Sequence, residues 1–114
     1  MVSFPLRVVY AISEAEEDRD VKVRMLVSVP KKHFKRAVKR NRVKRQVREA
    51  YRKNKHSLCD SIAAMPLACL DMAFVWLDDE LHSSAEVEKR IVKLLQRIEE
   101  RINRGGDATA AERQ

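Results

Sequence analysis

Residues 35–53 read KRAVKRNRVKRQVREAYRK, and this stretch decides the fold because its apolar residues follow the period of a helix. At about 100° per residue, four apolar residues share one helical face: Val43, Val47, Ala50 and Tyr51. Phe34 and Val38 fall on the opposite side, so we expect the regular helix to begin at about Ala37 and residues 31–36 to form a connector. The apolar face requires a core to pack against.

The side of this helix away from its apolar face is basic. Residues 31–55 hold 13 of the 24 Lys and Arg residues and one acid, Glu49, so this segment carries +12 and the remainder carries −5. Solvated helix faces usually mix both signs at a spacing of four. We therefore expect a polyanion to bind here. The residues that we assign to this basic surface are Lys31, Lys32, Arg36, Arg40, Asn41, Arg42, Lys44, Arg45, Arg48 and Arg52.

Nucleic acid is the favoured polyanion. Arginine dominates the surface, and its planar guanidinium makes paired hydrogen bonds to phosphate while condensed counterions are released. An anionic membrane is less favoured because the apolar face of the helix is needed for the core and lacks bulky insertion residues. DNA ranks below RNA because Asn41 and Gln46 are the only amides among the cations of the helix. A purely structural, solvated charge run is the remaining alternative.

Two strands precede the helix. Apolar residues alternate over residues 6–12 and again over residues 21–29, the period of a strand with one buried face. Residues 13–20 are acidic and without period, which predicts a loop. Pro30 ends the second strand because proline has no N–H to donate.

The segments after the helix differ in how clearly they can be interpreted. Residues 56–70 leave helix, turn and loop open. Residues 72–77 are apolar at every position, which predicts an interior strand covered on both sides. Ser83 followed by Glu86 is a capping box, which predicts that a helix begins here. Gly105 predicts where that helix ends. The apolar face of that helix comprises Val87, Ile91, Leu94, Leu95, Ile98 and Ile102.

Length and composition predict one small domain. The chain has 114 residues, so we expect a single domain over residues 1–104 and a disordered tail over 105–114. It has no apolar run of about 20 residues and no signal-peptide pattern, which predicts a cytoplasmic protein. Cys59 and Cys69 form no CxxC pair and the three histidines are scattered, so neither a disulfide framework nor a zinc site is supported.

The polypeptide alone carries no recognisable catalytic motif. Both glycines lie in the tail, which excludes a glycine-rich phosphate loop, and no triad of a nucleophile with its base is recognisable. Asp78, Asp79 and Glu80 could bind a divalent cation, but at the end of a strand a polar turn is the favoured interpretation.

The basic segment also carries a family resemblance. RNRVKR at residues 40–45, followed by REAYR at 48–52, resembles the RNR signature of the protein subunit of bacterial ribonuclease P. The resemblance is good over about residues 6–53, and DMAFVWL at 71–77 resembles the last strand of that family. About three-quarters of the chain is covered.

The resemblance implies a fold. It is an α+β fold, a single small α/β sandwich of the ribosomal protein S5 domain 2-like kind. The central sheet is mostly antiparallel, the RNR helix lies in a left-handed βαβ crossover, against the usual preference, and a C-terminal helix follows.

The resemblance also implies a function. Ribonuclease P removes the 5′ leader of precursor tRNA, and its RNA subunit carries the active site and binds most of the Mg²⁺. The basic surface would contact the catalytic RNA and help to order metal near it, and the cleft between the sheet and the RNR helix would bind the single-stranded leader. Tyr10 falls where the family has an aromatic leader contact, and a core tyrosine is its alternative interpretation. The competing function is a noncatalytic RNA-binding or ribosome-associated protein.

The chain departs from the family pattern in two places. Family members begin with a basic helix and a Phe-containing segment before the first strand, so we expect this chain to be an N-terminally trimmed or mis-started form that lacks part of the leader cleft. Their last strand usually runs into a basic residue, whereas this one runs into Asp78, Asp79 and Glu80, which weakens the case for an RNA contact there.

Overall fold

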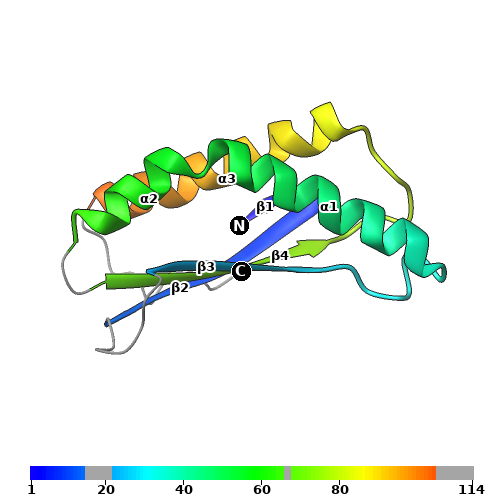
Figure 1. Ribbon diagram of the computed structural model, residues 1–114, viewed down its shortest axis with the longest axis horizontal. Helices are drawn as coiled ribbons and strands as arrows, with labels where there is room; N and C mark the ends of the chain where they lie inside the picture. Colours follow the sequence, from blue (N-terminus) through cyan, green and yellow to red (C-terminus); the bar gives the residue numbers. More distant parts are fainter. Residues whose placement is uncertain (15–21, 66–67, 105–114) are drawn as a thin grey trace.

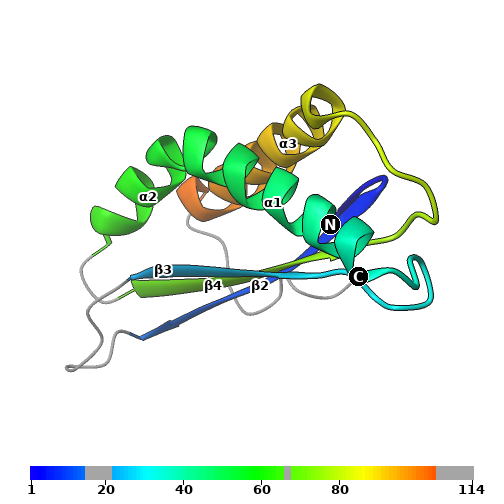
Figure 2. The ribbon, with the colours of Figure 1, turned by 45° about the vertical axis from the view of Figure 1, so that its right-hand side comes forward.

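The computed structural model describes residues 1–14, 22–65 and 68–104. Three helices cover one face of a four-stranded sheet (Figure 1), and the turned view of Figure 2 shows all three on the same side. The strands are β1 (Val2–Ser3), β2 (Leu6–Glu14), β3 (Val23–Ser28) and β4 (Ala68–Trp76). The helices are α1 (Ala37–Asn54), α2 (His56–Ala63) and α3 (Ser84–Asn103). The expected α+β architecture is confirmed.

The sheet has the order β1-β2-β4-β3. The pairs β1–β2 and β2–β4 are antiparallel, and β3–β4 is parallel, so the sheet is mostly antiparallel as expected. The parallel neighbours β3 and β4 cannot be joined by a tight turn. The chain therefore leaves the sheet after β3, forms α1 and α2 in the helical layer, and returns to the sheet as β4. The basic helix is therefore part of a βαβ crossover.

Strand register builds the apolar face under the helices. Tyr10 of β2 lies opposite Met72 of β4, which lies opposite Met25 of β3, and the next row in the sheet contains Val8, Phe74 and Val27. Val8 and Phe74 are completely buried. The predicted alternation in both strands is confirmed, although Val21 lies outside the described residues and Ser13 and Glu14 belong to β2 rather than to a loop.

β4 is central in the sheet, but the described part of the chain covers only one of its faces, so for these residues the prediction of an interior strand covered on both sides is wrong. Met72, Phe74 and Trp76 are buried under the helices, whereas Ala73 and Val75 are only half-buried. The reason is that α1, α2 and α3 share one face of the sheet (Figure 1).

The helices follow the sequence signals. α1 begins at Ala37 as expected, and Ser83 caps α3 by accepting a hydrogen bond from the Glu86 N–H at 3.2 Å. The undecided segment 56–70 contains α2 and the beginning of β4. The short β1 was not predicted, and the expected tail over 105–114 lies outside the described residues. None of the helices described is long and apolar enough to cross a membrane.

Candidate nucleic-acid interface

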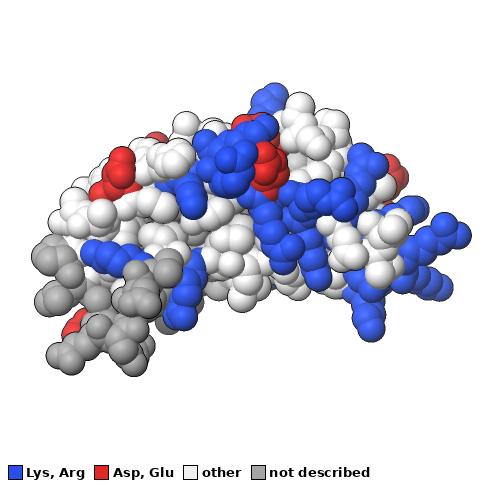
Figure 3. Space-filling view, viewed as in Figure 1, with Lys and Arg blue, Asp and Glu red and all other residues white. Residues whose placement is uncertain are grey.

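The outward face of α1 and the connector before it present the cations that the sequence predicts. Val43, Val47 and Ala50 anchor the helix to the core, which turns the opposite side to solvent. Figure 3 shows Lys and Arg side chains gathered over this part of the molecule. Arg40 and Lys44 are half-buried. The other predicted residues are all exposed: Lys31, Lys32, Arg36, Asn41, Arg42, Arg45, Arg48 and Arg52.

Arg40 makes a structural contact within the basic surface. Its Nη1 donates to the carbonyl oxygens of Phe34 at 2.7 Å and Lys35 at 2.9 Å. Because α1 has no side-chain cap at its first turn, this guanidinium ties the helix to the preceding connector. Arg40 therefore positions the basic surface in addition to its predicted contact with RNA.

The remaining arginines of α1 differ in whether they have an acid partner. Glu49 accepts two hydrogen bonds from Arg52, at 3.0 and 2.7 Å, and this donation lowers the pKa of the Glu49 carboxyl. Arg42, Arg45 and Arg48 have neither an ion pair nor a hydrogen-bonded side-chain partner among the residues that the structure describes. A shallow hollow of about 360 Å³ on this surface is lined by Asn41, Lys44, Arg45, Arg48, Glu49 and Arg52.

Tyr10 lies in the core. Its side chain is 2% exposed, because Leu6, Val8 and Tyr10 share the face of β2 that the helices cover. An unpaired base could not stack on this ring without displacing the helical layer. The structure thus corresponds to the alternative interpretation, a core tyrosine, and we do not carry Tyr10 forward as a leader contact.

A second hollow lies where the cleft between sheet and helix was expected. It has a volume of about 400 Å³ and opens between the edge strand β3 and the helices α1 and α2. Met25, which lies in the same row of the sheet as Tyr10, contributes to its wall. The lining residues are Lys22, Val23, Met25, Tyr51, Lys55, Cys59 and Ala63.

This hollow combines an aromatic ring with cations. The Nζ of Lys55 lies 5.9 Å from the centre of the Tyr51 ring. The Nζ of Lys22 donates to the carbonyl of Ile62 in α2 at 3.2 Å and to that of Met65, just after this helix, at 2.8 Å. Burial, together with the neighbouring thiol of Cys59, raises the pKa of Tyr51 to about 12. The phenol therefore stays protonated at neutral pH. Sequence reasoning placed Tyr51 on the apolar face but missed the hollow, because Lys22 and Lys55 are far apart in the chain.

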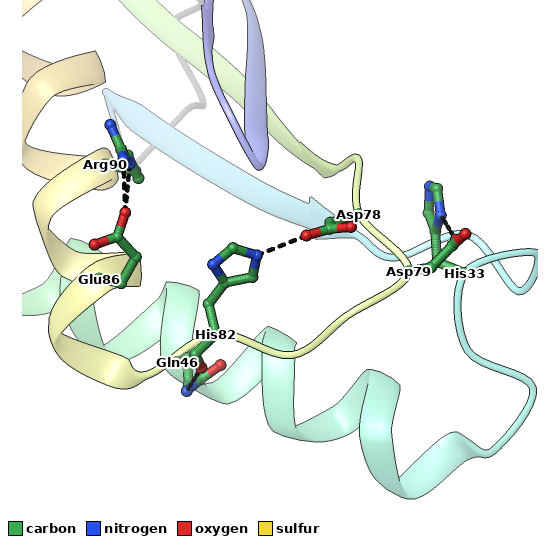
Figure 4. Close-up of polar contacts among 7 residues, drawn as sticks. All are labelled: His33, Gln46, Asp78, Asp79, His82, Glu86 and Arg90. Carbon is green, nitrogen blue, oxygen red and sulfur yellow. Dashed lines mark hydrogen bonds and ion pairs between the residues drawn. The ribbon is translucent and has the colours of Figure 1, made fainter.

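The acids after β4 bind histidines. Asp78 lies 2.7 Å from Nε2 of His82, and Asp79 lies 2.7 Å from Nδ1 of His33 (Figure 4). The hydrogen bond from His82 lowers the pKa of the Asp78 carboxyl. Within the described segments, no group of three or more His, Cys, Asp or Glu side chains is placed to hold a metal ion. Among the residues described, these acids are thus paired with histidines and are not grouped as ligands for Mg²⁺.

Comparisons with known proteins agree with this geometry. A sequence model of the family described as Ribonuclease P matches residues 2–99. Proteins named "Ribonuclease P protein component" from two strains of Porphyromonas gingivalis are each 50% identical over 97 residues, covering 85% of this chain and 69% of theirs. A protein of the same name from Pseudoalteromonas translucida is 37% identical over 82 residues, covering 72% of this chain and 53% of its own. No solved structure matches the chain. Because the family match spans most of its length, the chain belongs to the ribonuclease P protein family.

Proposed function

We propose that this member of the ribonuclease P protein family binds the catalytic RNA of ribonuclease P through its basic surface and assists removal of the 5′ leader from precursor tRNA. The observation that carries the proposal is the set of exposed arginines on α1 without an acid partner, Arg42, Arg45 and Arg48. The proposal also places the protein in the cytoplasm with its RNA.

The surface suits a phosphate backbone better than a base sequence. Each guanidinium can make two parallel hydrogen bonds to one phosphate, and each phosphate neutralised releases condensed counterions. Asn41 is the one amide among the residues of the basic surface. The protein would therefore contribute affinity and orientation, while the chemistry and its Mg²⁺ belong to the RNA subunit.

The hollow beside β3 is suited to an unpaired nucleotide of the leader. The Tyr51 ring and Met25 offer apolar contacts to a base, and Lys55 offers a cation to the adjoining phosphate. Stacking of a base on an aromatic ring is worth about 1–3 kcal/mol. In this proposal the aromatic residue that contacts the leader is therefore Tyr51 and not Tyr10.

Reconstituted cleavage tests the proposal directly. The protein is added to the ribonuclease P RNA of the same organism at a Mg²⁺ concentration too low for the RNA to act alone. We expect it to restore cleavage of precursor tRNA at the 5′ end of the mature sequence. Binding to this RNA without any stimulation of cleavage would favour the noncatalytic RNA-binding alternative.

The leader contact has its own test. Tyr51→Ala should weaken binding of precursor tRNA to the reconstituted enzyme by about 1–3 kcal/mol and leave binding of mature tRNA nearly unchanged, because the mature form has no leader. Tyr51→Phe keeps the ring and should behave like the wild type. Equal losses for precursor and mature tRNA would place the leader outside this hollow.

A further inference from the structure

We infer that Asp79 is a positioning residue for RNA binding: by holding His33 it fixes the turn that presents Lys31 and Lys32 beside α1. The inference rests on the proposed function. Simple electrostatics predicts the opposite, because an exposed acid next to a polyanion-binding surface should weaken binding.

The two lysines lie at the apex of a closed turn. The backbone N–H of His33 donates to the carbonyl of Pro30 at 3.1 Å, so Lys31 and Lys32 occupy the two central positions, and both are exposed. One end of this turn continues from β3 through the buried Val29. The orientation of the lysines therefore depends on how the other end is held.

Asp79 holds that other end. Its Oδ1 lies 2.7 Å from Nδ1 of His33, and the His33 side chain is only 11% exposed whereas that of Asp79 is 77% exposed. The imidazole is therefore packed against the fold, and the carboxylate closes over it from the loop after β4. Phe34, the next residue, is buried and provides a second anchor, so loss of Asp79 should loosen the turn without unfolding the protein.

The loop that carries Asp79 is itself tied to the basic helix. Asp78 contacts His82 at 2.7 Å, and the His82 ring meets Trp76 edge-on with centroids 5.4 Å apart. Nε2 of Gln46, on α1, donates to the His82 carbonyl at 3.0 Å (Figure 4). The same Nε2 donates to the Ser84 hydroxyl at 3.1 Å. We name Asp78, Asp79, His33 and His82 the acidic clasp. It joins the lysine turn and α1 into one surface, so that cations from two segments can meet the same RNA backbone.

The chain offers matched variants for the test. Asp79→Ala removes both the charge and the hydrogen bond to His33, whereas Asp79→Asn removes the charge and keeps a carbonyl oxygen as acceptor. Glu80→Ala removes a neighbouring exposed acid that has no side-chain partner among the residues described. Affinity for the organism's ribonuclease P RNA is measured over a range of salt, and thermal unfolding of each variant confirms that it is folded.

We expect Asp79→Ala to bind this RNA roughly three- to tenfold more weakly than the wild type, although it has lost a negative charge. Glu80→Ala and Asp79→Asn should bind at least as tightly as the wild type. Asp79→Ala should also flatten the plot of log affinity against log salt, since the displaced lysines release fewer counterions. For the same reason, replacing Lys31 and Lys32 with Ala should cost less affinity in the Asp79→Ala background than in the wild type.

Three results would overturn the inference. Asp79→Ala binding as tightly as Glu80→Ala would show that Asp79 acts only as a charge. Asp79→Asn losing as much affinity as Asp79→Ala would remove the hydrogen bond from the explanation. A wild-type protein that does not bind ribonuclease P RNA in preference to an unrelated structured RNA would refute the proposed function, and the inference with it.

Discussion

Tyr10 and Tyr51 contribute to the molecule in different ways, although both side chains contact apolar residues. Tyr10 is 2% exposed in the centre of the core, and Tyr51 lines a hollow at the edge of α1. We therefore expect mutation of Tyr10 to lower the stability of the fold, and mutation of Tyr51 to change how the free energy of unfolding depends on pH.

Tyr10→Ala should destabilise the domain by about 3–5 kcal/mol, because it removes a large buried ring and leaves a cavity between β2 and the helices. Urea unfolding followed by circular dichroism measures this change. A loss of RNA binding in this variant would then follow from unfolding. A fully stable Tyr10→Ala variant would contradict the placement of the ring in the core.

Tyr51 should make stability sensitive to alkaline pH. Its pKa is raised to about 12 in the folded state, whereas an unfolded tyrosine titrates near 10. Between these values the unfolded chain has released the proton and the folded protein still holds it, so the contribution is complete below pH 10 and is lost as pH rises toward 12. The free energy of unfolding should fall more steeply over this range in the wild type than in Tyr51→Phe. Parallel curves would contradict the raised pKa.

The two faces of helix α1 have different roles: the buried face stabilises the fold, and the exposed face is the one proposed to bind RNA. Val47 is completely buried, whereas Arg48, one residue further, is exposed. At this scale, the phase of the helix decides which substitutions damage the fold and which damage only the interface. The pairing of Arg52 with Glu49 leaves the middle of the helix, around Arg45 and Arg48, as the part most open to phosphate.

Val47→Asp should cost about 3–5 kcal/mol of stability, because it places an unpaired charge in the core. Arg48→Asp should leave the fold intact and weaken RNA binding. Circular dichroism melts of the two variants give the comparison, with RNA affinity measured on whichever is folded. The reverse order of melting temperatures would mean that the helical phase is wrong.

At the scale of the whole molecule, the fold concentrates charge. The chain carries +7 overall, and the segment of residues 31–55 alone carries +12. The crossover places this segment beside the edge strand β3, and Figure 3 shows Lys and Arg side chains gathered on the face in view. Association with RNA should therefore be oriented, and it should depend on salt in proportion to the phosphates contacted.

Replacing Arg45 and Arg48 together with Ala should weaken RNA binding by orders of magnitude. It should also flatten the plot of log affinity against log salt by about two phosphate contacts, because each cation removed releases about one counterion fewer. Filter binding of ribonuclease P RNA at several salt concentrations measures the slope. A slope equal to that of the wild type would exclude these two arginines from the interface.

The sequence by itself determined the local features of this protein. The spacing of Val43, Val47 and Ala50 set the phase of α1, and Ser83 with Glu86 set the start of α3, because a periodicity and a capping box involve neighbours in the chain. The RNR signature likewise predicted the family and the cations that face solvent.

Only the tertiary structure decided which residues from distant segments meet. The alternation of β2 was correct, yet it could not say whether Tyr10 faced a cleft or the helical layer, since both lie on the same face of the strand. The hollow lined by Tyr51 forms because β3 lies beside α1 and α2, and the acidic clasp forms because the loop after β4 lies beside His33. These contacts depend on strand order and on the crossover, which bring together groups far apart in the chain, such as His33 and Asp79, 46 residues apart.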